Sequence, residues 1–263
     1  MKHYGHDALI ALVLLFSAFG YIISCTHENM PPPASSGTPI INRGTDVLLA
    51  GTTSGDTTQW KLDQAHSSAL WSTNYVGASG LLTGRFNEFG MHDVTDDKAK
   101  QYPTTGQPLP DTSWAFYESD PGKTYFSGYV QLNTINTGEP SRDSGCALSS
   151  LGTIKIIPGV QNLTIQNLAK IKTTSIVFDT QSAGYIVTMD MTWQGLLTTP
   201  LTESVTGKLA YIKKSYVNEG TPAQYGVFGL QLEFQFNCRD FGITSTNISD
   251  NITIQCNMNF NNQ

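Results

Sequence analysis

The chain has 263 residues, of which 14% are charged, and a formal net charge of −6. This charged fraction is well below the about 25% of an average soluble protein. Thr, Ser, Asn and Gly make up the difference, a balance typical of an exported β protein with many turns. The pI near 5.3 and the lack of any Lys/Arg cluster in the sequence argue against nucleic acid as a partner, because phosphate binding requires basic patches.

The N-terminal residues predict export. The apolar run from Ala8 to Ile23 is shorter than the about 20 residues of a transmembrane helix but suits the core of a signal peptide. It ends in Ile22-Ile23-Ser24-Cys25, which resembles the lipobox of bacterial lipoproteins. That resemblance implies a signal peptide over residues 1–24 and lipid on Cys25. The mature protein would then be anchored in the cell envelope, on a bacterial membrane facing the periplasm or the cell exterior.

Two other interpretations of this segment stay open. The apolar run would also serve as an uncleaved anchor, and Ala18-Phe19-Gly20 would also serve as an ordinary cleavage site that releases a soluble protein. Asp7 is unusual in the basic region before a signal-peptide core. Beyond Cys25, the Pro- and Gly-rich composition of residues 25–58 predicts a lipidated cysteine followed by a flexible tether. Residues 59–263 are left as one domain.

From Gln59 onward, apolar residues recur with a period of two, which is typical of strands with one apolar and one wet face. The strongest alternation covers 185–193, 228–236 and 252–260. Weaker strands are predicted at 59–63, 67–76, 81–89, 113–118, 124–135, 171–178 and 201–212. The best helix candidate is short and lies near Ser141–Leu151. About ten one-sided strands can hide their apolar faces in a closed barrel or in a two-sheet sandwich. Periodicity alone does not choose between them.

Five separated segments resemble the YceI-like family, in the same order over residues 59–263. They are Trp60–Trp71, Val76–Phe89, Ile135–Asp143, Val187–Thr202 and Arg239–Ile243. The resemblance implies an all-β fold: a single antiparallel lipocalin-like β-barrel with one short helix and long loops at one end. It also implies an elongated apolar interior, because members are similar to carriers of polyisoprenoids or other long-chain amphiphiles. Residues 90–123 and 152–170 depart from the family pattern and are expected to reshape the mouth of the barrel.

The inward apolar stripes supply the candidate ligand-binding residues. The candidates for the cavity lining are Trp71, Phe86, Met189, Met191, Trp193, Phe228, Phe234 and Phe236. Met and aromatic side chains favour adaptable contact with an apolar chain. The alternative is an ordinary packed core, since a barrel of about eight strands is either filled by side chains or holds one small ligand.

No catalytic residue, metal site or cofactor is predicted. Asp63, His66 and Ser67 invite comparison with a catalytic triad, but on a strand His66 and Ser67 would point to opposite faces. A structural role near the start of the barrel, in which Asp63 and His66 satisfy buried polar groups, is the better interpretation. Only His66 and His92 follow the tether, and no spacing indicates a metal site.

Two Arg-Asp pairs and three cysteines complete the candidates. Arg142-Asp143 and Arg239-Asp240 either contact a ligand head group or pair locally and fix loop geometry. Cys238 and Cys256 share the parity of inward-facing apolar residues on strands joined by a loop. We therefore predict a Cys238–Cys256 disulfide and a free Cys146.

The leading functional hypothesis is a non-catalytic, membrane-anchored binder or carrier of a long-chain lipid held in the barrel. The second is a surface or structural lipoprotein that contacts protein or glycan through its loops, where Tyr102, Trp114 and Tyr117 would be exposed. An enzyme is the third. The sequence does not indicate an oligomeric state.

Overall fold

The structure is a computed structural model, and its description covers most of the predicted barrel domain. The described residues are 61–77, 79–91, 114–115, 124–145, 150–152, 167–182, 184–217 and 225–261. The predicted signal peptide, Cys25 and the tether lie outside them, as do most of the predicted long loops. Within the described residues, no helix is long and apolar enough to cross a membrane.

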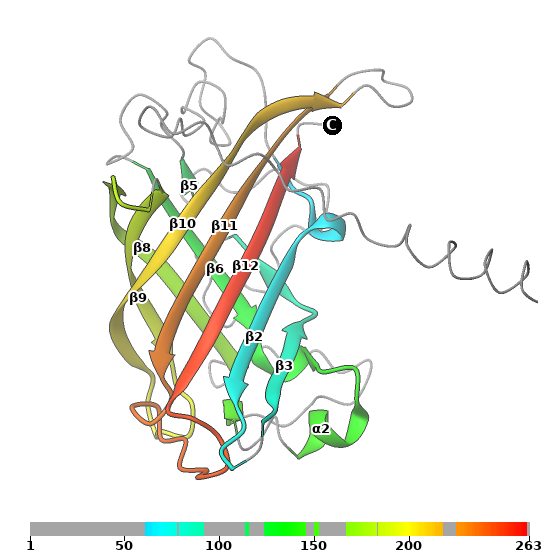
Figure 1. Ribbon diagram of the computed structural model, residues 1–263, viewed down its shortest axis with the longest axis vertical. Helices are drawn as coiled ribbons and strands as arrows, with labels where there is room; N and C mark the ends of the chain where they lie inside the picture. The colour runs from blue at the N-terminus through cyan, green and yellow to red at the C-terminus, as the bar shows by residue number, and fades with distance from the viewer. Residues whose placement is uncertain are drawn as a thin grey trace, which may run out of the picture. The chain divides into compact units, whose positions relative to one another are not determined.

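The strands pair into one antiparallel, 12-stranded sheet with the order β4-β6-β8-β9-β10-β11-β12-β2-β3-β7, to which β1 and β5 add at β12 and β6 (Figure 1). The bounds are β1 Lys61–Leu62, β2 Ser68–Asn74, β3 Leu81–Phe86, β4 Phe89–Gly90, β5 Trp114–Ala115, β6 Tyr125–Gln131, β7 Ile135–Asn136, β8 Leu168–Asp179, β9 Gly184–Trp193, β10 Leu201–Val217, β11 Tyr225–Asn237 and β12 Asn251–Asn261. Each strand predicted from the sequence has a counterpart here.

The two ends of this strand order meet in one stretch of chain. Strands β3 and β4 are separated only by Asn87 and Glu88, yet β3 pairs with β2 and β7 while β4 pairs with β6. Backbone hydrogen bonds cross the junction: the amide of Asn87 donates to the Thr134 carbonyl at 3.1 Å, and the amide of Gln131 donates to the Glu88 carbonyl at 2.9 Å. The sheet therefore closes on itself, and the barrel, rather than the sandwich, is confirmed.

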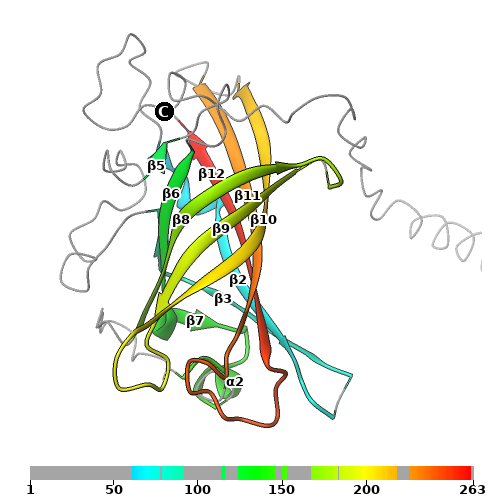
Figure 2. The same cartoon turned by 90° about the vertical axis from the view of Figure 1, so that its left-hand side faces the viewer.

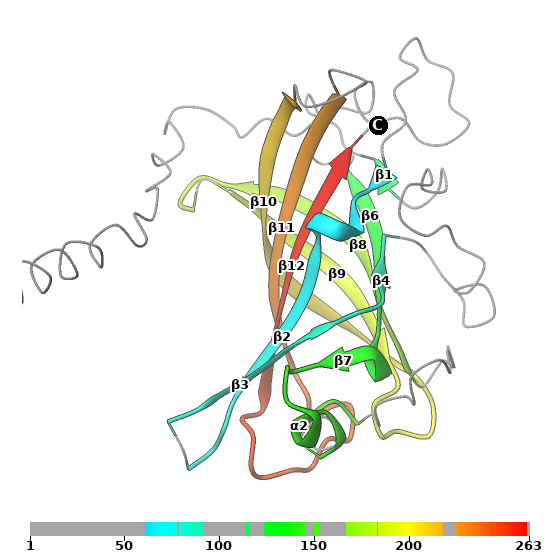
Figure 3. The same ribbon diagram turned by 90° about the vertical axis from the view of Figure 1, so that its right-hand side faces the viewer.

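The local structure differs from the predictions in three places. Residues Gln64–His66, between two predicted strands, form a 3-10 turn, so His66 does not lie on a strand as assumed. A second 3-10 turn, Leu132–Thr134, and the short β7 continue β6. The expected short helix is α2, Pro140–Ser144, which lies with β7 at one end of the barrel (Figure 3).

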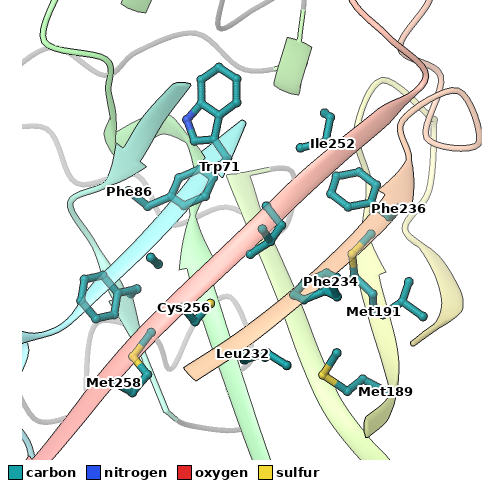
Figure 4. Packing of buried hydrophobic residues seen from close by; sticks show 14 of the residues in the cluster. Trp71, Phe86, Met189, Met191, Leu232, Phe234, Phe236, Ile252, Cys256 and Met258 are labelled. Carbon is teal, nitrogen blue, oxygen red and sulfur yellow. The ribbon is translucent and has the colours of Figure 1, made fainter. Parts of the chain in front are cut away.

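One face of the wall points inward and forms the core. Along β9, the inward side chains of Tyr185, Val187, Met189, Met191 and Trp193 are each at most 3% exposed. The alternation continues on β11 and β12, whose inward residues include Leu232, Phe234, Phe236, Ile252, Cys256 and Met258 (Figure 4). The alternation seen in the sequence is thus the alternation between the barrel interior and its outer surface.

Candidate functional site

An apolar cavity lies inside the wall. Its lining residues come from β3, β4, β6 and β8 to β12: Phe86, Gly90, Met91, Phe126, Gly128, Tyr129, Val130, Leu132, Leu151, Ala169, Lys170, Ile171, Met191, Trp193, Leu209, Leu230, Leu232, Phe234, Phe236, Ile254, Cys256 and Met258. The space between these side chains amounts to about 800 Å³, part of it open to solvent, and little of it is wide enough for a water molecule. The cavity is therefore a narrow slot, which suits a slim chain better than a bulky ring.

The predicted lining residues divide into two groups. Phe86, Met191, Trp193, Phe234 and Phe236 line the cavity. The other three, Trp71, Met189 and Phe228, are equally buried but are absent from that lining. Met189 and Phe228 belong to packed layers of the wall, whereas Trp71 lines a second pocket formed by β2, β3, β7 and β12.

Parity along a strand identifies inward residues but does not give their level along the barrel. Leu230 and Leu232 share the parity of Phe234, and Ile254, Cys256 and Met258 share one face of β12. All five line the cavity and were absent from the predicted lining, although the alternation in the sequence contains them. Met91 and Leu151 carry no such signal, because neither lies on a regular strand.

Two polar residues of the lining belong to the outer wall. Tyr129 and Lys170 are paired across β6 and β8, while their neighbours Gly128 and Ile171 carry the inward parity. Burial, together with the nearby Glu88, raises the pKa of Tyr129 to about 12. Cys256 sits on the inward face of β12, and burial raises the pKa of its thiol to about 12. The cavity thus offers no ionised group from Tyr129 or Cys256 at neutral pH.

Aromatic side chains close one end of the cavity. The Trp193 ring lies 5.6 Å from that of Phe236 and 4.9 Å from that of Phe241. The amide of Leu196 donates to the Phe241 carbonyl at 3.0 Å, which ties the β9–β10 connection to the β11–β12 connection. Figure 2 shows both connections at the same end as α2.

The Asp63-x-x-His66-Ser67 segment forms a structural clamp. Asp63 caps the 3-10 turn by accepting from the amide of His66 at 3.3 Å, and its other carboxylate oxygen lies 2.7 Å from His66 Nδ1. The Ser67 hydroxyl donates to the Asp63 carbonyl at 2.6 Å and accepts from the amide of Asn259 at 2.9 Å. His66 Nδ1 faces the carboxylate, while the Ser67 hydroxyl is held by main-chain groups, so the three do not form a proton relay. The prediction that His66 satisfies a buried group is wrong, because its side chain is 77% exposed.

The two Arg-Asp segments also fix local geometry. Arg239 donates through Nε to Asp250 at 2.8 Å, not to its neighbour Asp240. Its terminal nitrogens bind the carbonyls of Ile243, Ser245 and Ile248 at 2.8 to 2.9 Å, so one guanidinium organises the whole β11–β12 connection.

Asp143 has an equivalent role in the turn before α2. It is 2% exposed and accepts from both the amide and the hydroxyl of Thr137 at 2.8 Å. Arg142, beside it, is exposed. The geometry supports local anchoring by both segments rather than contact with a ligand in the cavity.

The predicted Cys238–Cys256 disulfide is wrong. Both cysteines are buried free thiols. Cys256 pairs with Leu232, whereas Cys238 follows the end of β11. Six positions along a strand correspond to about 20 Å, while a disulfide needs Cα atoms within about 7 Å. The prediction that both side chains share the inward parity was correct, but the register of β11 against β12 keeps the two cysteines apart. Cys146 lies outside the described residues.

No group of three potential metal-ligating side chains is found in the described part of the chain. Of the residues proposed for surface contacts, Tyr102 and Tyr117 lie outside that part. Trp114 is placed in β5, which pairs with β6.

No curated protein matched the sequence. A solved structure described as a polyisoprenoid binding domain from Saccharophagus degradans, implicated in plant cell wall breakdown, is similar over 79% of this chain and 100% of that chain. The two share 12% sequence identity, and the TM-score is 0.42. The family model described as YceI-like domain matches residues 60–260. The match covers most of the chain, from β1 into β12, and the chain therefore belongs to the YceI-like family.

Proposed function

We propose that the protein binds or carries a long-chain apolar or amphiphilic lipid, isoprenoid or fatty-acid-like, inside the barrel. The observation that carries this proposal is the narrow cavity, which is lined almost entirely by apolar side chains from the short strands β3, β4 and β6 and from the long strands β8 to β12. Transfer of each methylene group from water to such an interior is favourable by about 0.8 kcal/mol. A chain of many methylene groups therefore needs few polar contacts to bind.

The flexibility of the lining supports a chain as the ligand. Met91, Met191 and Met258 line the cavity, and the unbranched thioether side chain of methionine adapts to irregular apolar surfaces. A narrow slot with such walls accommodates chains that differ in length and branching. This favours a binding role over a catalytic one.

We also propose that lipid on Cys25 holds the protein at a bacterial membrane. A binder of water-insoluble chains has to receive and deliver them at a membrane, and an anchor with at least two acyl chains is effectively permanent. Cys25→Ala should leave an unprocessed or mislocalised precursor that no longer partitions into a detergent phase. Unchanged processing and partitioning would contradict the anchor and favour cleavage after Gly20.

Two methionines on one strand provide the test of the cavity. Met191 lines the cavity, whereas Met189, on the same face of β9 and 0% exposed, does not. Met191→Glu should give a folded protein without co-purifying lipid, because space beside the new carboxylate admits water. Met189→Glu should unfold the domain, since an unpaired charge in a packed layer costs several kcal/mol.

Circular dichroism reports the fold, and lipid extraction with mass spectrometry reports the ligand. Native mass spectrometry of the unmodified protein is the independent readout. If that protein carries no lipid and takes up none from vesicles, the binding proposal fails whatever the variants do. A surface scaffold acting through its loops would then be the better assignment.

A further inference from the structure

The indole of Trp193 presents an unused hydrogen-bond donor at the closed end of the cavity. The side chain is 2% exposed and lines the cavity. Its Nε1 atom is buried, with no hydrogen-bond partner in the described part of the protein. The packed neighbours of the ring are Phe236 and Phe241, and aromatic faces accept hydrogen bonds only weakly. Buried donors are almost always paired, and because Trp193 lines the cavity, a ligand there can supply the acceptor that the described residues do not.

A second unpaired group lies at the same end. The hydroxyl of Ser150 is buried without a partner among the described residues, and Ser150 is 0% exposed. The next residue, Leu151, lines the cavity together with Trp193. A Cβ on Gly152 would lie about 3.0 to 3.1 Å from side-chain carbons of Ile243 and Leu196, which places this segment against the connections that follow β11 and β9.

The rest of the lining cannot pair with a polar ligand group in the same way. Toward the opposite end, the lining is formed by Leu209, Leu230 and Met258, whose side chains neither donate nor accept strongly. Tyr129 and Lys170 carry the outward parity of their strands. The closed end is therefore the polar end of an otherwise apolar slot.

The chemistry of the donor restricts the ligand group. An indole nitrogen donates one hydrogen bond and accepts none, so the ligand must supply an acceptor. A buried anion needs a paired charge or several donors to offset its lost hydration. Here the lining supplies one indole N–H, and the hydroxyl of Ser150 lies next to the lining residue Leu151. The matching group is a neutral oxygen: a hydroxyl, carbonyl, ester or amide.

We propose that the lipid lies in the barrel with its polar terminus at the closed end, where a neutral oxygen accepts a hydrogen bond from Trp193 Nε1. The hydroxyl of Ser150 lies at the same end as a second hydrogen-bonding group. The apolar chain extends away from this end past Met191 and Cys256 toward Met258. This inference rests on the proposed lipid-binding function and adds the orientation of the ligand and the class of its terminal group.

Three diterpenoid probes of equal chain length distinguish the proposed orientation of the ligand from lipid binding itself. They are geranylgeraniol, its monophosphate and the corresponding hydrocarbon. Their affinities are measured by competition with a fluorescent fatty-acid probe, for the unmodified protein and for Trp193→Phe. That variant keeps an aromatic ring and removes the N–H. Trp71→Phe is the matched control, because Trp71 is 1% exposed and its Nε1 also lacks a partner in the described residues, but it does not line the cavity.

We expect Trp193→Phe to weaken binding of the alcohol by about fivefold to tenfold, as for loss of one buried neutral hydrogen bond. Binding of the hydrocarbon should be unchanged, and Trp71→Phe should leave the alcohol-to-hydrocarbon ratio unaltered. An unchanged ratio in Trp193→Phe overturns the inference, as does tightest binding of the phosphate in both proteins. Failure of the unmodified protein to bind any of the three probes instead refutes lipid binding itself.

A spectroscopic readout does not depend on the stability of the variant. In the unmodified, nitrogen-15-labelled protein, the indole N–H resonance of Trp193 should move downfield when geranylgeraniol is added, because the proton gains an acceptor. The hydrocarbon should not cause this shift. The Trp71 resonance, assigned by its loss in Trp71→Phe, serves as the internal reference. A Trp193 resonance that responds equally to both ligands contradicts the assignment.

Discussion

Strands β8 to β12 run for 10 to 17 residues each, whereas β2, β3, β4, β6 and β7 run for two to seven. The long strands form a continuous wall whose inward face is almost purely apolar. The short strands are interrupted by turns, and polar side chains fill the interruptions. We call these the long-stranded side and the closing side of the barrel.

Different interactions stabilise each of the two sides. On the closing side, the Thr134 hydroxyl donates to the Gln131 carbonyl at 2.7 Å and accepts from the amide of Glu88 at 3.0 Å. The buried side chains of Gln131 and Asn133 also bind each other at 2.8 Å. Regular pairing needs no such help, because every main-chain group already has a partner. Closing a barrel therefore relies on a few specific side chains where strand pairing is interrupted.

The largest expected effect concerns the interior of the long-stranded side. Burial raises the pKa of Cys256 from 9.0 to about 12, which lowers its thiolate fraction at pH 8 by about a thousandfold. Alkylation of Cys256 in the folded protein should therefore be at least about a hundredfold slower than in urea, as followed by peptide mass spectrometry. Equal rates in the two conditions, or a disulfide-linked peptide in an unreduced digest, would show that the interior is not as described.

The next effect tests the connection at the closed end of the long-stranded side. Gly195 has a φ of +58°, and a Cβ there would overlap the carbonyl oxygen of Phe241. Gly195→Ala should cost about 3 to 4 kcal/mol of unfolding free energy in urea titrations, combining backbone strain with a clash against main chain. Gly77 is the control: its φ is +82° but a Cβ meets nothing within 4 Å, so Gly77→Ala should cost only about 1 kcal/mol. Similar values for both variants would mean that the clash is relieved by movement of the loop.

Replacing threonine hydroxyl groups tests the difference between the two sides most directly. Thr134→Val keeps the shape of the side chain but leaves the Glu88 amide and the Gln131 carbonyl without their partner. We expect a loss of about 2 kcal/mol in urea unfolding. Thr206→Val, at an exposed position on β10, should change stability by less than about 0.5 kcal/mol. If both substitutions are neutral, side-chain hydrogen bonds do not hold the closing side.

The smallest effect concerns the turn between β8 and β9. The Ser182 hydroxyl and then the Gln181 amide lower the pKa of Asp179. A carboxyl group whose pKa is lower in the folded state stabilises the protein above its unfolded pKa, and that contribution is lost as the pH falls through the folded pKa. Thermal melting below about pH 4 should therefore decline slightly more steeply in the unmodified protein than in Asp179→Asn. Parallel pH profiles would assign this turn no electrostatic role.

The sequence predicted strands on both sides of the barrel, but it did not predict how the closing side pairs and turns. Alternation over 185–193, 228–236 and 252–260 predicted β9, β11 and β12 because one apolar face is a local property of each strand. The turn at 64–66 lies between two predicted strands and was not itself predicted, although Asp63 is a good N-cap residue for such a turn. The pairing of β3 with β7 depends on contacts between distant segments, which no local pattern contains.

The candidate site was predicted in part for the same reason. Met189 and Met191 share strand, face and chemistry, and only the register of β9 against β8 and β10 sets which of them reaches the cavity. Register also refuted the disulfide, because Cys256 pairs with Leu232 and not with a residue near Cys238. The unpaired donor of Trp193 emerges only once its neighbours are known.

The pairing of β2, near the start of the domain, with β12, at its end, has a consequence for how the protein is made. Strand β2 pairs with β12, and Ser67 accepts a hydrogen bond from Asn259, 192 positions later. Such distant contacts form slowly during folding. A chain that emerges N-terminus first cannot complete the barrel until its final 11-residue strand has arrived, so the apolar faces of β9 to β11 stay uncovered from their own synthesis until that strand follows. A holding chaperone would shield these faces during that interval.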